Sequence, residues 1–113
     1  MDATDTTSLQ KGSAELLVLA VLDGPARHGY ELAQIIETRS DGRLRFQAAT
    51  LYPLLYKLEK RGLVAGKWVE KPGERRRRFY RLTPAGKTML RERRKLWRAF
   101  LEALDQVAAV RHA

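Results

Sequence analysis

QAATLYPLLYKLEKRG, residues 47–62, is the stretch that decides the fold. At about 100° per residue its leucines share one side of a helix, and the opposite side carries hydroxyl, phenol and ammonium groups. Because proline is tolerated near the start of a helix and glycine ends one, Pro53 and Gly62 predict a helix of about three turns. We expect the core to be contacted by Leu51, Leu54, Leu55 and Leu58.

The polar side of this segment suits a polyanion. It carries cations and groups that can form hydrogen bonds with base edges, and its one carboxylate, Glu59, lies at the flank. An ordinary amphipathic helix with a solvated polar face is the alternative, and the segment alone does not decide between the two. The candidate DNA-contacting residues are Thr50, Tyr52, Tyr56, Lys57 and Lys60.

Length and composition exclude several classes of protein. The 113 residues make one domain, and 44% hydrophobic residues suffice for a modest core. The absence of cysteine excludes disulfides and thiolate chemistry and fits a reducing compartment. No apolar run is long enough to span a bilayer, and the N-terminus lacks signal-peptide character. We therefore expect a cytoplasmic protein that makes no membrane contact.

Nothing in the sequence indicates catalysis. It contains no Ser/His/Asp grouping, no glycine-rich phosphate loop and no carboxylate pair at a catalytic spacing. The two histidines, His28 and His112, are isolated and have no cysteine near them, so they do not form a metal site. We expect no enzyme activity, no metal and no cofactor, and we expect His28 to be hydrogen-bonded or to touch a phosphate.

The positive charge is confined to one half of the chain. Residues 63–113 hold 14 Lys/Arg and 5 Asp/Glu, whereas residues 1–62 hold 8 of each, so the second half supplies the whole net charge of +9. A localised basic region indicates a polyanionic partner. Nucleic acid is the first choice and an anionic membrane the second, with charge that serves only solubility as the remaining alternative.

Two helices are expected before the deciding stretch. Residues 13–24, SAELLVLAVLDG, begin with a capping serine, end at a glycine and are apolar on nearly every side. Such a helix is buried either partly against another subunit or as one central core helix. Residues 31–42, ELAQIIETRSDG, predict a second helix of about three turns. Residues 43–46 alternate as in a very short strand or an extended link.

A change of period after Gly62 predicts a β-hairpin. Residues 63–71 and 77–82 alternate between apolar or aromatic and polar side chains, and Pro-Gly-Glu at residues 72–74 is a turn signal. Consecutive arginines occupy its tip and return strand, where the two faces cannot both be buried. Beside a polyanion-facing helix, phosphate or minor-groove contacts are favoured over a solvated charge run for Arg75, Arg76, Arg77 and Arg78.

The C-terminal segment predicts a long helix with an uncovered apolar seam. Thr83 and Pro84 suit its start, and no helix breaker follows until about residue 110. Its heptad repeat favours a two-fold dimer, and a fold back onto the first helix is the alternative. Trp97 is either a packing anchor there or a platform for a planar aromatic ligand. The expected dimer residues are Leu90, Trp97, Phe100, Leu101, Leu104 and Val107.

Three helices, a basic hairpin and a long terminal helix are the elements of a winged helix-turn-helix, a mainly α (α+β) fold, with a dimerisation helix. The expected organisation is a flexible tail over residues 1–10, a DNA-binding domain over 11–82 and a dimerisation helix over 83–110. The expected function is sequence-specific regulation of transcription by a homodimer on a pseudo-palindromic operator in double-stranded DNA. A non-specific architectural or RNA-binding protein is the alternative.

The sequence also resembles the PadR family of bacterial transcriptional regulators, in its short subgroup with one C-terminal helix. KGSAELLVLAVLDGPARHGYEL, ATLYPLLYKLEKRGLV and GERRRRFYRLTPAG carry the resemblance, which covers about residues 9–105. It implies a recognition helix over residues 47–61, a wing over 67–82 and a dimer helix over 83–110. Ala49 stands where the family often has glycine. Members are typically repressors, and some are released by phenolic acids or flat hydrophobic drugs, which raises a small aromatic effector without identifying it.

Overall fold

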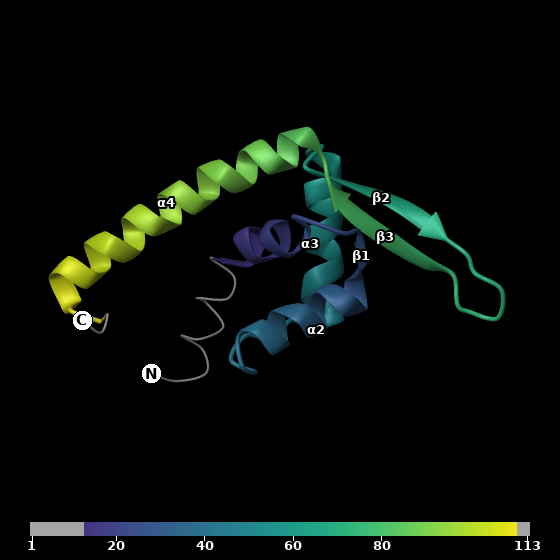
Figure 1. Ribbon diagram of the computed structural model, residues 1–113, viewed down its shortest axis with the longest axis horizontal. Coiled ribbons are helices and arrows are strands. Elements are labelled where there is room, and N and C mark those ends of the chain that lie inside the picture. The colour runs from purple at the N-terminus through teal and green to yellow at the C-terminus, as the bar shows by residue number, and fades with distance from the viewer. Residues whose placement is uncertain (1–12, 111–113) are drawn as a thin grey trace.

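The computed structural model of the protein describes residues 13–110, which form a winged helix with a long C-terminal helix (Figure 1). The expected tail over residues 1–10 lies outside the described residues. The chain runs through a first helix over residues 13–21, then β1 (Arg27–His28), α2 (Gly29–Arg39), α3 (Ala48–Lys60), β2 (Val64–Val69), β3 (Arg77–Leu82) and α4 (Pro84–Ala108).

The core lies between the first helix, α2, α3 and the base of the sheet. Leu19, Leu32 and Leu55, one from each of the three helices, have no exposed surface. The first helix places Val18 and Val21 in the same core, and Leu16, Leu17 and Ala20 pack against it. Burial within the chain's own domain, one of the two expected arrangements, therefore accounts for most of the apolar surface of this helix.

α3 is the amphipathic helix that the deciding stretch predicts. Gly62 ends it with a φ of +75°, in the left-handed region that glycine adopts without strain. The backbone N–H of Gly62 donates to the carbonyl of Glu59 at 2.9 Å, and that of Leu63 donates to Leu58 at 3.0 Å. These two bonds satisfy carbonyls that the helix itself leaves free. The end of α3 is thus fixed by local sequence.

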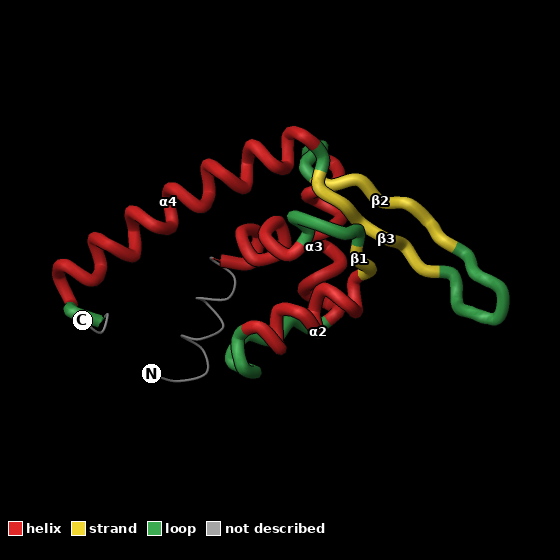
Figure 2. Tube along the Cα trace, in the orientation of Figure 1, coloured by secondary structure: helices red, strands yellow, loops and turns green. Residues whose placement is uncertain are grey.

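The sheet contains the expected hairpin and one strand that was not predicted. β3 pairs with β2 on one side and with β1 on the other, all antiparallel (Figure 2). The 2 residues of β1 are too few to produce an alternating pattern in the sequence. β2 ends at Val69 rather than at residue 71, and residues 43–47 form a link without strand structure.

α4 starts against the end of α3. The Thr83 hydroxyl accepts from the N–H of Gly86 at 3.0 Å and donates to the carbonyl of Gly62 at 2.6 Å. A Cβ atom at residue 86 would lie 2.0 Å from the Leu63 carbonyl oxygen, so this contact requires glycine. From this anchored start α4 extends away on one side of the molecule, and the β2–β3 hairpin extends away on the other (Figure 1).

One residue of the expected dimer seam lies elsewhere. Leu90 is only 2% exposed and belongs to the domain core, so its assignment to the dimer interface was wrong. The early turns of α4 pack on their own domain, which a heptad pattern alone does not reveal. Farther along, α4 exposes large apolar side chains, namely Leu96, Phe100, Leu101, Leu104 and Val107. Within residues 13–110, no helix combines the length and the apolar character needed to cross a membrane.

Candidate nucleic-acid interface

The start of α2, the exposed side of α3 and the wing enclose a basic groove of about 660 Å³. The phenols of Tyr30 and Tyr52 and the imidazole of His28 line it, together with the arginines at positions 75–78. None of the described residues that line this groove is a carboxylate. A groove with cations, phenols and no acidic group suits an anionic ligand.

His28 fixes the hydrogen-bond chemistry at the start of α2. Its Nδ1 accepts from the backbone N–H of Glu31 at 3.2 Å and so caps the helix. A neutral ring that accepts at Nδ1 carries its proton on Nε2. That Nε2 lies 2.8 Å from Nη1 of Arg77, and a guanidinium can only donate. A neutral imidazole accepts at only one of its two nitrogens, so His28 cannot accept from both Glu31 and Arg77, and the roles in the second contact depend on the tautomer. An anionic oxygen beside Arg77 would give its guanidinium an acceptor.

The other wing arginines differ in their surroundings. Arg76 lies over the Trp68 ring, 4.5 Å from its centroid, and pairs with Glu70 at 3.2 Å in a largely exposed contact. Arg75 is exposed and has no hydrogen-bond or ion-pair partner among residues 13–110. Exposed ion pairs are worth less than about 1 kcal/mol, so Arg76 can exchange its carboxylate for a phosphate at little cost. Arg75, Arg76 and Arg77 are thus available to an external anion.

Arg78 makes a contact with α3 that was not expected. Its guanidinium pairs with the Glu59 carboxylate of α3 and lies 5.8 Å from the ring centroids of both Trp68 and Tyr80. A Cβ at residue 66 would come within 2.3 Å of the Arg78 Nε, so Gly66 leaves the room for this contact. Arg78 thus joins the wing to α3 through this ion pair, and its expected DNA contact stays a prediction.

Tyr80 lies beside this ion pair on β3. It is only 7% exposed. Burial raises the pKa of its phenol above the ordinary value, and the nearby positive charge of Arg78 opposes that increase. The phenol is therefore neutral at ordinary pH and serves to pack the base of the wing.

The exposed side of α3 carries all the expected contact residues. Tyr56 is 62% exposed, and the Lys60 ammonium lies 5.4 Å from its ring centroid. Tyr52 is 47% exposed, and its ring lies so close to Gly29 that a Cβ there would be 2.7 Å away. Thr50 and Lys57 are also exposed. These five side chains are therefore exposed to solvent on one side of α3, and their contact with DNA stays a prediction.

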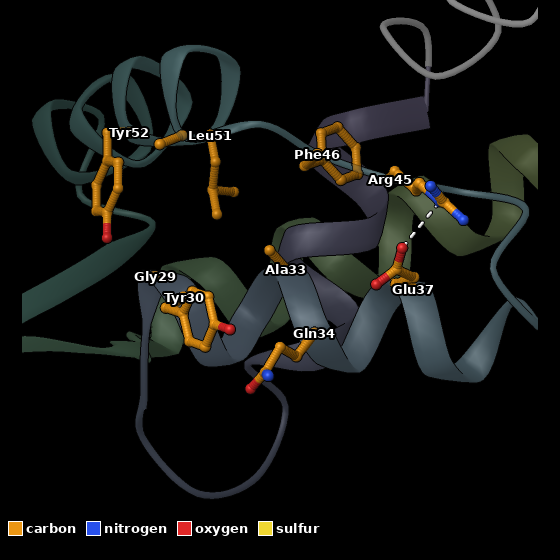
Figure 3. Close-up of a pocket in the computed structure, with 10 residues that line it drawn as sticks. Gly29, Tyr30, Ala33, Gln34, Glu37, Arg45, Phe46, Leu51 and Tyr52 are labelled. Atoms are coloured by element: carbon orange, nitrogen blue, oxygen red, sulfur yellow. Dashed lines mark ion pairs between the residues drawn. The ribbon is translucent and has the colours of Figure 1, made fainter.

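A second cleft, of about 410 Å³, separates α2 from α3 (Figure 3). Tyr30 and Tyr52 stand at one end of it, and the ion pair of Arg45 and Glu37, 2.8 Å long, stands at the other. The two tyrosines line both this cleft and the basic groove. They therefore form the boundary between the two hollows.

Sequence reasoning missed three residues of this surface. Tyr30 is 64% exposed at the second position of α2. Its position two residues after His28 could have indicated that it lies on the same surface as His28. Trp68 faces Arg78 across the β2–β3 ladder, which the alternation of the hairpin could have revealed. Glu59 was seen as a flanking carboxylate, but no local pattern connects it to a wing arginine 19 residues away.

The fold and this surface define a winged helix-turn-helix protein whose exposed helix, wing and basic groove lie together. The pattern that describes the Transcriptional regulator PadR-like family matches residues 18–92, about two thirds of the chain. The chain belongs to this family of transcriptional regulators, which confirms the resemblance seen in the sequence.

Solved structures and a curated relative are similar over most of their lengths. A PadR family transcriptional regulator from Eggerthella lenta is 29% identical, with a TM-score of 0.80 over 96% of this chain and 93% of that chain. A regulator from Clostridium thermocellum, with a TM-score of 0.82 at 24% identity over 89% of this chain and 98% of that chain, supports the fold alone. "Uncharacterized protein X" of Lysinibacillus sphaericus is 30% identical over 95 residues, 84% of this chain and 87% of the relative.

Proposed function

We propose that the protein is a cytoplasmic homodimeric repressor that binds a pseudo-palindromic operator in double-stranded DNA. The observation that carries this proposal is the basic groove between the start of α2, α3 and the wing, which the arginines at positions 75–78 line and no described carboxylate lines. A phosphate oxygen of the DNA backbone accepts from the guanidinium groups in this groove. Repression, as opposed to activation, follows from the usual activity of the family.

In this mechanism each subunit inserts α3 into a major groove. Thr50, Tyr56 and Lys57 contact base edges and nearby phosphates, and Tyr52 and Lys60 contact the backbone at the sides of the helix. The wing places Arg75, Arg76 and Arg77 along the flanking backbone or minor groove. Because Arg78 pairs with Glu59, the wing and α3 keep a fixed separation and engage the duplex together.

A second copy of the chain covers the apolar side of α4. Phe100 is 54% exposed and Leu101 is 51% exposed, and they stand among other large apolar side chains. Each square ångström of apolar surface removed from water contributes about 25 cal/mol, so pairing two such helices is favourable. An isologous pair gives a two-fold axis and places the α3 helices in successive major grooves about 34 Å apart.

Trp97 marks the place where we put a planar aromatic effector between the subunits. Its ring is half-buried and meets the Phe100 ring edge to face, with the centroids 5.8 Å apart. Such a ligand lowers DNA affinity only by preferring a dimer whose α3 helices are wrongly spaced. Trp97→Ala should abolish the response and spare DNA binding without ligand. If that variant were monomeric, Trp97 would be a packing anchor and the ligand site would be rejected.

The proposal is tested by comparing an operator duplex, selected with the wild-type protein, with a random duplex of equal length in fluorescence anisotropy titrations. Tyr56→Ala should weaken operator binding by about tenfold and random binding far less, since a base contact is worth about 1–3 kcal/mol. Tyr30→Ala is the matched control, because an exposed phenol that contacts phosphate should lose equal affinity on both. If the wild-type protein did not distinguish the duplexes, non-specific nucleic-acid binding would replace the proposal.

A further inference from the structure

α4 is anchored to the domain near its start and uncovered farther on. Thr83 and Gly86 hold its first turn against Gly62 and Leu63, the residues that end α3. Leu90, one turn later, is buried in the core. The exposed apolar side chains lie beyond these contacts. The direction in which the uncovered part of α4 leaves the domain is therefore set by contacts between its first turn and about residue 94.

Glu15 of the first helix supplies a further link between α4 and the end of α3. Its Oε2 lies 3.1 Å from Nη1 of Arg61, the residue that caps the end of α3. Its Oε1 lies 3.0 Å from Nη2 of Arg93 on α4, as an ion pair without the alignment of a hydrogen bond. The Glu15 side chain is only 22% exposed, so water competes little for the carboxylate.

A second, longer ion pair joins α4 to the turn that follows the first helix. Arg94 Nη1 lies 3.7 Å from Asp23 Oδ2, and both side chains are nearly half exposed. This contact is longer and more solvated than those of Glu15, so it contributes less. Of the charged contacts among residues 13–110, those of Glu15 therefore restrain the angle between α4 and α3 most strongly.

We propose that Glu15 determines the specificity of the protein for the spacing between operator half-sites. The inference rests on the proposed homodimer, in which α4 connects the two subunits. In such a dimer, the angle between α4 and α3 fixes the distance and the rotation between the two recognition helices. Glu15 acts as a positioning residue: it holds this angle through Arg61 and Arg93, and DNA is contacted by other residues.

The length of α4 makes the spacing sensitive to this angle. Its 25 residues span about 37 Å at a rise of about 1.5 Å per residue. A tilt of roughly 5° at its anchored start moves the far end by about 3 Å. One base pair advances the duplex by about 3.4 Å and turns it by about 35°. Loosening the Glu15 contacts should therefore let the dimer accept half-sites one base pair closer or farther apart.

The test starts from a half-site that the wild-type protein selects from random duplexes. Duplexes with two inverted copies of that half-site, and spacers that differ by one base pair, are then bound by wild type and by Glu15→Gln. Each lost ion pair is worth up to about fivefold, and a dimer loses the Glu15 contacts of both subunits, so we expect the preference for the best spacing over its neighbours to fall by about fivefold per dimer. Affinity for the best spacing and the sedimentation coefficient should change little.

Two further variants keep the test decisive. Glu37→Gln makes the same change of charge and breaks the 2.8 Å ion pair with Arg45, which does not involve α4, so its spacing preference should equal that of wild type. Arg93→Gln should reproduce the broadening from the other side of the contact if Glu15→Gln folds poorly. If both Glu15→Gln and Arg93→Gln left the spacing preference unchanged, the inference about Glu15 would be overturned, and the proposed dimeric function would still stand. If the wild-type protein selected no inverted repeat, the proposed dimeric function would fail as well.

Discussion

Removing Arg75 and Arg77, two wing arginines without a carboxylate partner among residues 13–110, should flatten the salt dependence of operator binding. Each phosphate neutralised by the protein adds about −0.9 to the slope of log K against log salt. With about eight phosphate contacts per dimer, the wild-type slope should be about −7. The double substitution by alanine removes two contacts per subunit, so the slope should flatten by about 2 to 4 units.

This change is large enough to measure directly. Between about 50 and 200 mM salt, a difference of 2 to 4 units alters the ratio of variant to wild-type Kd by about 15- to 250-fold. Fluorescence anisotropy titrations at four or more salt concentrations give the slope of each protein. Base preference should stay nearly unchanged, because these side chains contact the backbone.

A double variant with the same loss of charge separates local contact from overall charge. Arg39 and Arg43 are exposed near the far end of α2, about 15 Å along the helix from His28. Substituting both by alanine should change the slope by less than about 1 unit. An unchanged slope in the wing variant, or equal flattening in both variants, would remove the wing from the mechanism.

Three other predictions concern the positions that support the interface. Arg78→Ala should lower the free energy of unfolding by about 1–3 kcal/mol in urea titrations, because it leaves Glu59 without its partner; Arg78 would be a surface cation if stability were unchanged. Gly86→Ala should cost about 1–3 kcal/mol, since its Cβ would meet the Leu63 carbonyl, and a fully stable variant would contradict that packing. Leu101→Lys should yield monomers in sedimentation experiments, and a dimer of wild-type affinity would place the interface elsewhere.

The features predicted correctly from the sequence are those set by neighbours along the chain. The leucine spacing gives the buried side of α3, and Gly62 gives its end, because both depend on residues within a few turns. Thr83 and Pro84 give the start of α4 in the same way. The face of α3 that carries Tyr56 follows directly from this local geometry.

The features that were missed or wrong depend on contacts between distant segments. A heptad pattern does not show whether its apolar side chains pack against the same domain or against a second subunit, and Leu90 packs against its own domain. A run of four arginines in the sequence does not show that the Arg78 side chain points toward α3, because that depends on Gly66 and on Glu59 in other elements. The 2 residues of β1 exist as a strand only because β3 pairs with them.

The central claim is sequence-specific recognition of DNA by two copies of α3. The most direct test is a pull-down of fragmented DNA from the source organism with the purified protein, at about physiological ionic strength, where binding to phosphates alone is weak. We predict recovery of one or a few sites that share an inverted repeat. Uniform recovery of all fragments would contradict the account and would mean that the basic surface binds DNA without recognising its sequence.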